Sequence, residues 1–419
     1  MVRPPEPAAR GLVAVLGATA IAGASGYAIQ LLAARLLADP HDYLSFSVFW
    51  STMYLIGSAV GGIQQEVARA AAPVLPEAPP GALRGFVAAA SVVVVAVAVL
   101  VGVSVAPIAF AGTGAGMAGA LAVGLLGYVA TSVLTGLLYG LHRLPSVAAL
   151  IVVDAVLRAA AVTLALALSA PPDVVALAVA MPFGIAVLVV WVMVRPRVRG
   201  MYALDVSPVR LACNTAHTVA AAAATGVMVT GMPLLLRLSL ADATVSTVAA
   251  LTLVITLTRA PFIIPLMALQ SYLTVVYRDA PARAEPRMLR YLAVAAAAAV
   301  AAGALAWLVV PWAIELISVG RYAVSPWTSS IIVVSAVLVG SLCVTGPLLL
   351  ARKQHRAYAA GWLWAAVSTI VLLALLPLAA QPRVVTALVL APAIGLIVHL
   401  AAVRWGHRPA VRKSAPDSE

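Results

Sequence analysis

Long apolar runs alternate with short polar connections along the whole chain. The runs are roughly 20 to 30 residues long and contain Gly and Pro, which is typical of membrane-spanning helices and not of alternating outer-membrane strands. The fold class predicted is therefore all-α, a polytopic membrane protein with about twelve transmembrane helices. The predicted spans cover residues 11–37, 44–72, 86–109, 116–140, 146–168, 174–194, 211–238, 243–276, 289–317, 328–351, 358–378 and 384–403.

The composition agrees with this pattern. Hydrophobic residues make up 63% of the 419 residues and charged residues 10%, which is more apolar surface than a soluble domain of this size hides in its core. If both termini are cytoplasmic, most of the 26 Lys and Arg residues fall on the cytoplasmic side, as expected for a multi-pass protein of the cell membrane. The net charge of +12 then reflects topology and contact with anionic membrane lipids, and no nucleic-acid binding is expected.

The chain divides into two halves of six spans each. The polar segment that begins at residue 201 separates a six-helix lobe at 1–200 from a second at 201–405, and a cytoplasmic tail follows at 406–419. Because six is an even number, both halves enter the membrane from the same side, so an axis along the membrane normal would relate them. The expected architecture is two lobes around a central cavity.

A polar stripe in the second span supports this repeat. Its spacing keeps the side chains on one face of a helix, and a shift of 205 residues places the same pattern in the eighth span, with one apolar member. The aligned positions are Ser47, Ser51, Tyr54, Ser58 and Gln65 in the second span, and Thr252, Thr256, Arg259, Ile263 and Gln270 in the eighth. Taken singly, Ser and Thr in such helices mostly bond their own backbone carbonyls. Together the two stripes predict that both helices face a polar cavity.

Two arginines lie within predicted spans, and their surroundings differ. Arg158 has Asp154 one helical turn earlier, so a structural ion pair is expected there. Arg259 has no carboxylate three or four residues away. An unpaired arginine near the bilayer centre costs on the order of 3 kcal/mol on insertion scales, and Arg259 is therefore the better candidate for a charge that faces a ligand.

The segment at 34–70 resembles the first helical hairpin of Wzx-type polysaccharide and oligosaccharide flippases. It contains the turn Leu36-Leu37-Ala38-Asp39-Pro40, Tyr43 and Phe46 at the start of the second span, and Arg69 at its end. Leu44 stands where the family pattern has glycine. These flippases belong to the multidrug/oligosaccharidyl-lipid/polysaccharide (MOP) exporter superfamily, which also includes lipid II flippases and multidrug extruders. The Ala- and Val-rich composition, with Arg favoured over Lys, suggests an actinobacterial source.

The resemblance implies a transporter and not an enzyme, without metal or cofactor. Its substrate would be a polyprenyl-linked saccharide for cell-surface polysaccharide or cell-wall biosynthesis, moved to the outer leaflet by alternating access, with cell-envelope biosynthesis proteins as possible partners. Arg259 would contact a phosphate or sugar acid, since a buried cation suits an anion. Neutral hydrogen bonds would come from Tyr54, Gln65, Gln270, Ser51 and Thr256, and Arg35 and Arg237 would receive the phosphate late in the cycle or anchor their helices at the interface.

Three alternatives stay open at this point. A multidrug extruder shares the layout, but cation exporters usually need acidic cavity residues. A lipid-carrier glycosyltransferase would use Asp39 and Asp42 in the first outer loop, which is short for such an enzyme. A non-transporting scaffold for cell-wall assembly is the third. The saccharide, the lipid carrier, the driving force and the oligomeric state do not follow from the sequence.

Overall fold

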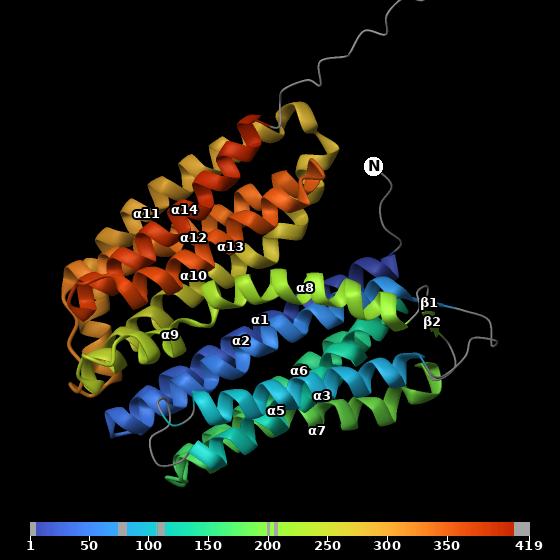
Figure 1. Ribbon diagram of the computed structural model, residues 1–419, viewed down its shortest axis with the longest axis horizontal. Helices are drawn as coiled ribbons and strands as arrows, with labels where there is room; N and C mark the ends of the chain where they lie inside the picture. Colours follow the sequence, from blue (N-terminus) through green and yellow to red (C-terminus); the bar gives the residue numbers. More distant parts are fainter. Residues whose placement is uncertain are drawn as a thin grey trace, which may run out of the picture.

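The computed structural model of the protein describes residues 6–73, 82–105, 107, 114–198, 202–204 and 208–405. Within these ranges the chain is almost entirely helical (Figure 1). The helices of the first half are α1 (Glu6–Leu36), α2 (Pro40–Ala70), α3 (Ala82–Ser104), α5 (Gly114–Gly140), α6 (Leu144–Ala167) and α7 (Pro172–Val198). Those of the second half are α8 (Pro208–Val229), α9 (Met232–Ser239), α10 (Val245–Asp279), α11 (Pro281–Ile317), α12 (Pro326–Ala351), α13 (His355–Leu375) and α14 (Ala380–Trp405).

Each predicted span corresponds to one helix, except that the seventh is broken into α8 and α9. Among the described residues, ten helices are long and apolar enough to cross a membrane, and the bent pair α8 and α9 makes an eleventh. In the remaining helix, α10, the stretch Val245–Arg259 counts as a shorter apolar helix. Several helices extend beyond the predicted spans because their polar ends stay helical outside the apolar run; α11, for example, begins at Pro281 and not at residue 289.

The two halves of the chain pack in the same way. In the first half α5 lies against α2, α3 and α7, and in the second half α12 lies against α10, α11 and α14. The last two helices of each half, α6 with α7 and α13 with α14, also form a close pair. Figure 1 shows the resulting two bundles, which lie closest near α9 and diverge towards the end that carries β1 and β2.

A shared turn supports the internal repeat. His142 follows α5 and Lys353 follows α12, and both adopt the left-handed conformation, with φ of 55° and 60°. After each of them the chain donates back to the preceding helix, from Arg143 N to Leu138 O and from Gln354 N to Leu349 O, both at 2.8 Å. This is the closing bond of a Schellman-type helix end, so the two lobes repeat a backbone detail as well as a helix order.

The broken seventh span joins the two lobes. Although α8 belongs to the second half of the sequence, it packs along α2 of the first half, while α9 contacts α2, α10 and α13. The axes of the two pieces differ by 71°. The break falls at Thr230 and Gly231, just before Pro233, whose missing N–H prevents a continuous helical ladder. The continuous span predicted at 211–238 is therefore corrected to two helices.

A short antiparallel ladder was not expected from the sequence. The strand β1 (Ala71–Pro73) pairs with β2 (Tyr202–Leu204), with Ala71 opposite Leu204. It ties the end of α2 to the connection between the two halves. The all-α class is unchanged, because each strand has only three residues.

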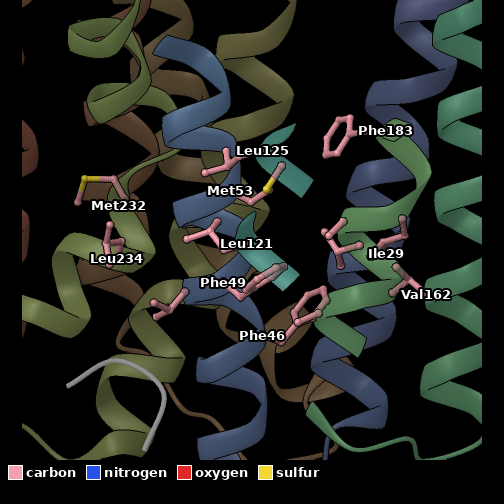
Figure 2. Close-up of a cluster of buried hydrophobic side chains, with 14 of the residues drawn as sticks. Ile29, Phe46, Phe49, Met53, Leu121, Leu125, Val162, Phe183, Met232 and Leu234 are labelled. Carbon is pink, nitrogen blue, oxygen red and sulfur yellow. The ribbon is translucent and has the colours of Figure 1, made fainter. Parts of the chain in front are cut away.

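The apolar core between α2, α5 and α9 positions the second helix. Phe49 and Met53 of α2 lie beside Leu121 and Leu125 of α5, with Met232 of α9 on the other side (Figure 2). Gly124 allows this contact, since a Cβ there would lie 2.9 Å from the sulfur of Met53. One face of α2 is thus fixed in the core. Another face of the same helix points to the region where the two halves of the chain meet.

Candidate functional site

A cavity of about 250 Å³ lies where the two halves of the protein meet. Its walls come from α1, α2, the break between α8 and α9, and α10. The residues that line it are Ala22, Gly23, Gly26, Tyr27, Gln30, Trp50, Ser51, Tyr54, Val229, Thr230, Met232, Pro233, Ile255, Thr256, Arg259 and Ile263. The two polar stripes therefore meet in one cavity through Ser51, Tyr54, Thr256 and Arg259, and Ile263, the apolar member of the second stripe, lines it as well.

Arg259 is the only charged residue among the described residues that line this cavity. Its side chain is 4% exposed, and within the described part of the chain Nε, Nη1 and Nη2 all lack a hydrogen-bond partner. A buried guanidinium without partners carries a large desolvation penalty. The cavity thus presents an uncompensated positive charge, which is the complement of an anionic group.

Ser51 has a structural role that the sequence did not indicate. Its hydroxyl donates to the carbonyl of Thr230 at 2.6 Å and accepts from the N–H of Leu234 at 3.3 Å. Both partners are backbone groups at the break of the seventh span, where the helical ladder leaves donors and acceptors unpaired. Ser51 thus bridges the broken helix and also lines the cavity, and its role in binding a ligand stays a prediction.

The expected ion pair between Asp154 and Arg158 is present in α6. The guanidinium of Arg158 also donates to the carbonyl of Val179 and lies over the ring of Phe183, 3.8 Å from its centroid. The Tyr54 ring is 5.8 Å from the same guanidinium. Arg158 is therefore held by α6, α7 and an aromatic face, outside the residues that line the cavity.

Two aromatic side chains form one wall of the cavity. The Trp50 and Tyr54 rings have centroids 4.9 Å apart. The small residues Gly23 and Gly26 of α1 line the same cavity, and Gly26 lies beside the Trp50 ring, which a Cβ there would approach to 3.6 Å. Trp50, Tyr27 and Gln30 were missed in the sequence. Trp50 lies one turn before Tyr54 on a helix with a recognised stripe, so helical spacing was a usable signal for it; α1 carries no such stripe.

Four predicted site residues lie outside the cavity lining. Gln65 is exposed near the end of α2, and Gln270 donates to the sulfur of Cys343 on α12 at 3.4 Å. Each glutamine is eleven residues from the cavity residue of its own helix, Tyr54 or Arg259, which places it about 16 Å further along the axis. The stripes share a face with the cavity but extend well past it, so the placement of both glutamines in the cavity is corrected.

Arg35 lies in the last turn of α1 and Arg237 in the last turn of α9. Arg237 is half-buried in α9 and does not line the cavity. Arg35 is exposed and donates to the carbonyl of Leu316 at 3.3 Å. A role of either residue in binding substrate stays a prediction.

The contact of Arg35 is part of a set of hydrogen bonds between the end of α1 and the region between α11 and α12, which we call the clasp. From the connection between α11 and α12, Arg321 donates to the carbonyls of Leu37, Ala34 and Arg35, at 2.6, 2.8 and 2.9 Å. A cation at the carboxyl end of α1 also complements the helix dipole. The buried rings of Tyr43 and Tyr322 pack nearby, with centroids 5.9 Å apart. The lobes are therefore held together at this end of the molecule.

Comparisons with solved structures show which known fold the protein has. The lipid II flippase MurJ in an inward closed conformation superimposes with a TM-score of 0.70, covering 94% of this chain and 87% of that one at 10% identity. A multidrug resistance MATE family transporter of the MOP superfamily, in an inward-facing conformation, gives a TM-score of 0.60 over 91% and 93% of the two chains at 14% identity. The protein has the fold of the MOP superfamily transporters.

The family follows from the sequence relatives. No family model matches the chain. Over 415 residues it is 32% identical to the uncharacterized protein Rv3630 of Mycobacterium tuberculosis, covering 94% of this chain and 92% of the relative. It is also 31% identical to the uncharacterized protein Rv1510 of the same species, over 96% and 93%. The chain belongs to the family of these mycobacterial proteins.

Proposed function

We propose that this protein is a membrane transporter that moves a polyprenyl-linked saccharide from the cytoplasmic to the outer leaflet. The single observation that carries the proposal is the unpaired, buried guanidinium of Arg259 in a cavity between two lobes. A phosphate or sugar acid at the polar end of the substrate would supply the missing anion. The MOP-type fold, which it shares with a lipid II flippase, supports the transport step.

The rest of the cavity suits the remainder of such a substrate. Tyr54, Thr256 and Gln30 line the cavity, where their polar groups would bond sugar hydroxyls. The Tyr27 hydroxyl already donates to the carbonyl of Leu257 at 2.9 Å. A polar head group cannot cross hydrocarbon unaided, whereas the prenyl chain stays in the lipid. The two-lobe fold supports alternating access, in which the lobes would rock about a central site. Proteins of cell-envelope biosynthesis would supply and receive the substrate.

The cavity favours an anion over the cationic compounds that multidrug extruders commonly export. None of the described residues that line it is Asp or Glu. A glycosyltransferase role receives no support from Asp39, whose carboxylate accepts from the N–H of His41 at 2.8 Å and caps α2. The anionic saccharide carrier is therefore the better assignment.

The test is transport in vesicles. Reconstituted protein and the variant Arg259→Gln would be compared in the exchange of a fluorescent polyprenyl-diphosphate disaccharide between leaflets, with an uncharged alkyl glycoside as second substrate. Arg278→Ala is the matched control, because Arg278 lies on the same helix but is exposed at its end. We expect fast exchange by the protein and by Arg278→Ala, and at least tenfold slower exchange of the charged lipid by Arg259→Gln.

Two results would contradict the proposal. Exchange no faster than in protein-free vesicles would remove the flippase assignment. Equal rates for the protein and Arg259→Gln on the charged lipid would remove Arg259 from the site while leaving transport intact.

A further inference from the structure

A buried histidine joins three helices in the core of the second lobe, away from the cavity. His399 of α14 is fully buried. Its Nδ1 lies 2.8 Å from the hydroxyl oxygen of Thr345 on α12, and its Nε2 lies 3.0 Å from the carbonyl oxygen of Tyr358 on α13. Both ring nitrogens thus have a partner on a neighbouring helix.

Two glycines on neighbouring helices leave space for the His399 ring and for the Tyr358 ring beside it. A Cβ at position 361 would lie 2.1 Å from the imidazole ring, so only glycine fits there without displacing the histidine. Gly346 likewise accommodates the Tyr358 ring, to which a Cβ would approach within 2.8 Å. That ring lies nearly parallel to the imidazole, with centroids 6.2 Å apart. Close glycine packing on α12 and α13 therefore holds His399 in one place.

The hydrogen-bond partners of His399 suit both the neutral and the doubly protonated imidazole ring. The contact with the Tyr358 carbonyl requires a proton on Nε2, because a carbonyl only accepts. The Thr345 hydroxyl lies within hydrogen-bond distance of both Nδ1 and the carbonyl of Ser341, at 2.8 and 2.9 Å, yet it has one proton to donate. With neutral histidine, the hydroxyl satisfies Nδ1 or Ser341 but not both. With a second proton on the ring, Nδ1 donates to Thr345 and Thr345 donates to Ser341.

We propose that His399 is a proton-binding site of the second lobe. Rotation of one hydroxyl, that of Thr345, satisfies the ring in both the neutral and the charged form, so a proton binds and leaves without movement of a heavy atom. The proposal does not depend on the identity of the transported substrate. It gives the protein a proton-binding histidine at the junction of α12, α13 and α14, apart from the cavity.

The groups that face His399 do not fix its charge. In the described part of the chain, the apolar clusters next to His399 contain the titratable residues Tyr358 on α13, Cys343 on α12 and Tyr277 on α10. The two ring nitrogens contact a hydroxyl and a carbonyl, neither of which is charged. Glu285 and Arg352 pair with each other at the helix ends at 3.1 Å. Without a fixed counter-ion the charged form depends on its hydrogen bonds, and the Thr345 hydroxyl is the bond that matters.

The experiment measures the protonation of His399 directly. Protein labelled with ¹⁵N at its six histidines would be placed in lipid nanodiscs, and side-chain nitrogen spectra recorded from pH 5 to 8. Subtraction of the His399→Gln spectrum isolates the residue. We expect its two nitrogens to change from the neutral Nε2–H form to the doubly protonated form as the pH falls.

Two substitutions at Thr345 give the matched comparison. Thr345→Val keeps the shape but removes the hydroxyl, so proton affinity should fall roughly tenfold or more, the effect of one hydrogen bond to a charged group. Thr345→Ser keeps the hydroxyl and should titrate as the parent protein does. This pair needs no His399 variant, because the altered resonance identifies the residue. A ring that stays neutral from pH 5 to 8, or equal titration of the Val and Ser variants, would overturn the proposal.

Discussion

Arg158 and Arg259 are both buried in membrane-spanning helices, one in each lobe, but only one of them is neutralised. Arg158 pairs with Asp154, donates to a carbonyl on α7 and lies against Phe183. Arg259 has no partner within the described residues and lines the cavity. The two arginines are equally buried, but Arg158 holds two helices together, whereas Arg259 has a charge that no described residue neutralises.

The largest effect is expected from removing Arg158. Arg158→Met leaves the partly buried Asp154 without its cation, and breaking a buried pair from one side typically costs about 3–5 kcal/mol. Thermal unfolding in detergent would show a marked loss of stability. The double variant Asp154→Asn with Arg158→Met should recover much of it, and failure of that recovery would mean that the pair is not what stabilises α6 against α7.

Substitution of Arg259 is expected to raise the free energy of unfolding, whereas substitution of Arg158 lowers it. Arg259→Met removes an unpaired buried charge and fills its volume with apolar atoms, so the free energy of unfolding should rise by about 1–3 kcal/mol while exchange of the charged lipid is lost. Stability gained at the expense of function is typical of binding residues. The same unfolding assay measures it, and a destabilised variant would show that Arg259 has a structural partner after all.

A loss of stability is also expected when the hydrogen bonds at the break of the seventh span are removed. Ser51→Ala removes the hydroxyl that bonds Thr230 and Leu234 and leaves two backbone groups unpaired, at a cost of about 1–3 kcal/mol. Ser58→Ala is the control, since among the residues that the structure describes Ser58 bonds only the carbonyl of Tyr54 on its own helix, at 2.8 Å. Equal unfolding temperatures for the two variants would refute the bridging role of Ser51.

The smallest change in stability is expected at the clasp. Arg321→Gln loses the hydrogen bonds to the carboxyl end of α1, which should shift the population of conformations more than the folded fraction. Introduced cysteines at positions 36 and 319, both exposed beside the clasp, would report the change through the fluorescence of attached dyes. A shorter or unchanged distance in Arg321→Gln would contradict the clasp.

The success of the sequence analysis differs between residues for physical reasons. The Asp154–Arg158 pair was predicted because both partners lie one turn apart on one helix, where spacing alone brings them together. The lack of a nearby carboxylate at Arg259 was equally local. Tyr27 and Gln30 were missed because α1 carries no polar stripe, so only packing sets which of its faces meets the cavity. Trp50 was missed although the helical spacing on α2 offered a signal for it. Gln270 was misplaced because its partner, Cys343, lies on a helix far along the chain.

The sequence by itself determined the all-α membrane class and the charge at Arg259 that has no carboxylate nearby along its helix, because the membrane penalises polar groups residue by residue. Tertiary structure alone decided which polar residues meet. The seventh span bends at Gly231, and the Ser51 hydroxyl bonds the backbone at the break. Arg259 lines the same cavity and has no hydrogen-bond partner among the described residues. Tertiary structure also enclosed His399 among three helices. Such contacts depend on distances between helices that no local pattern encodes.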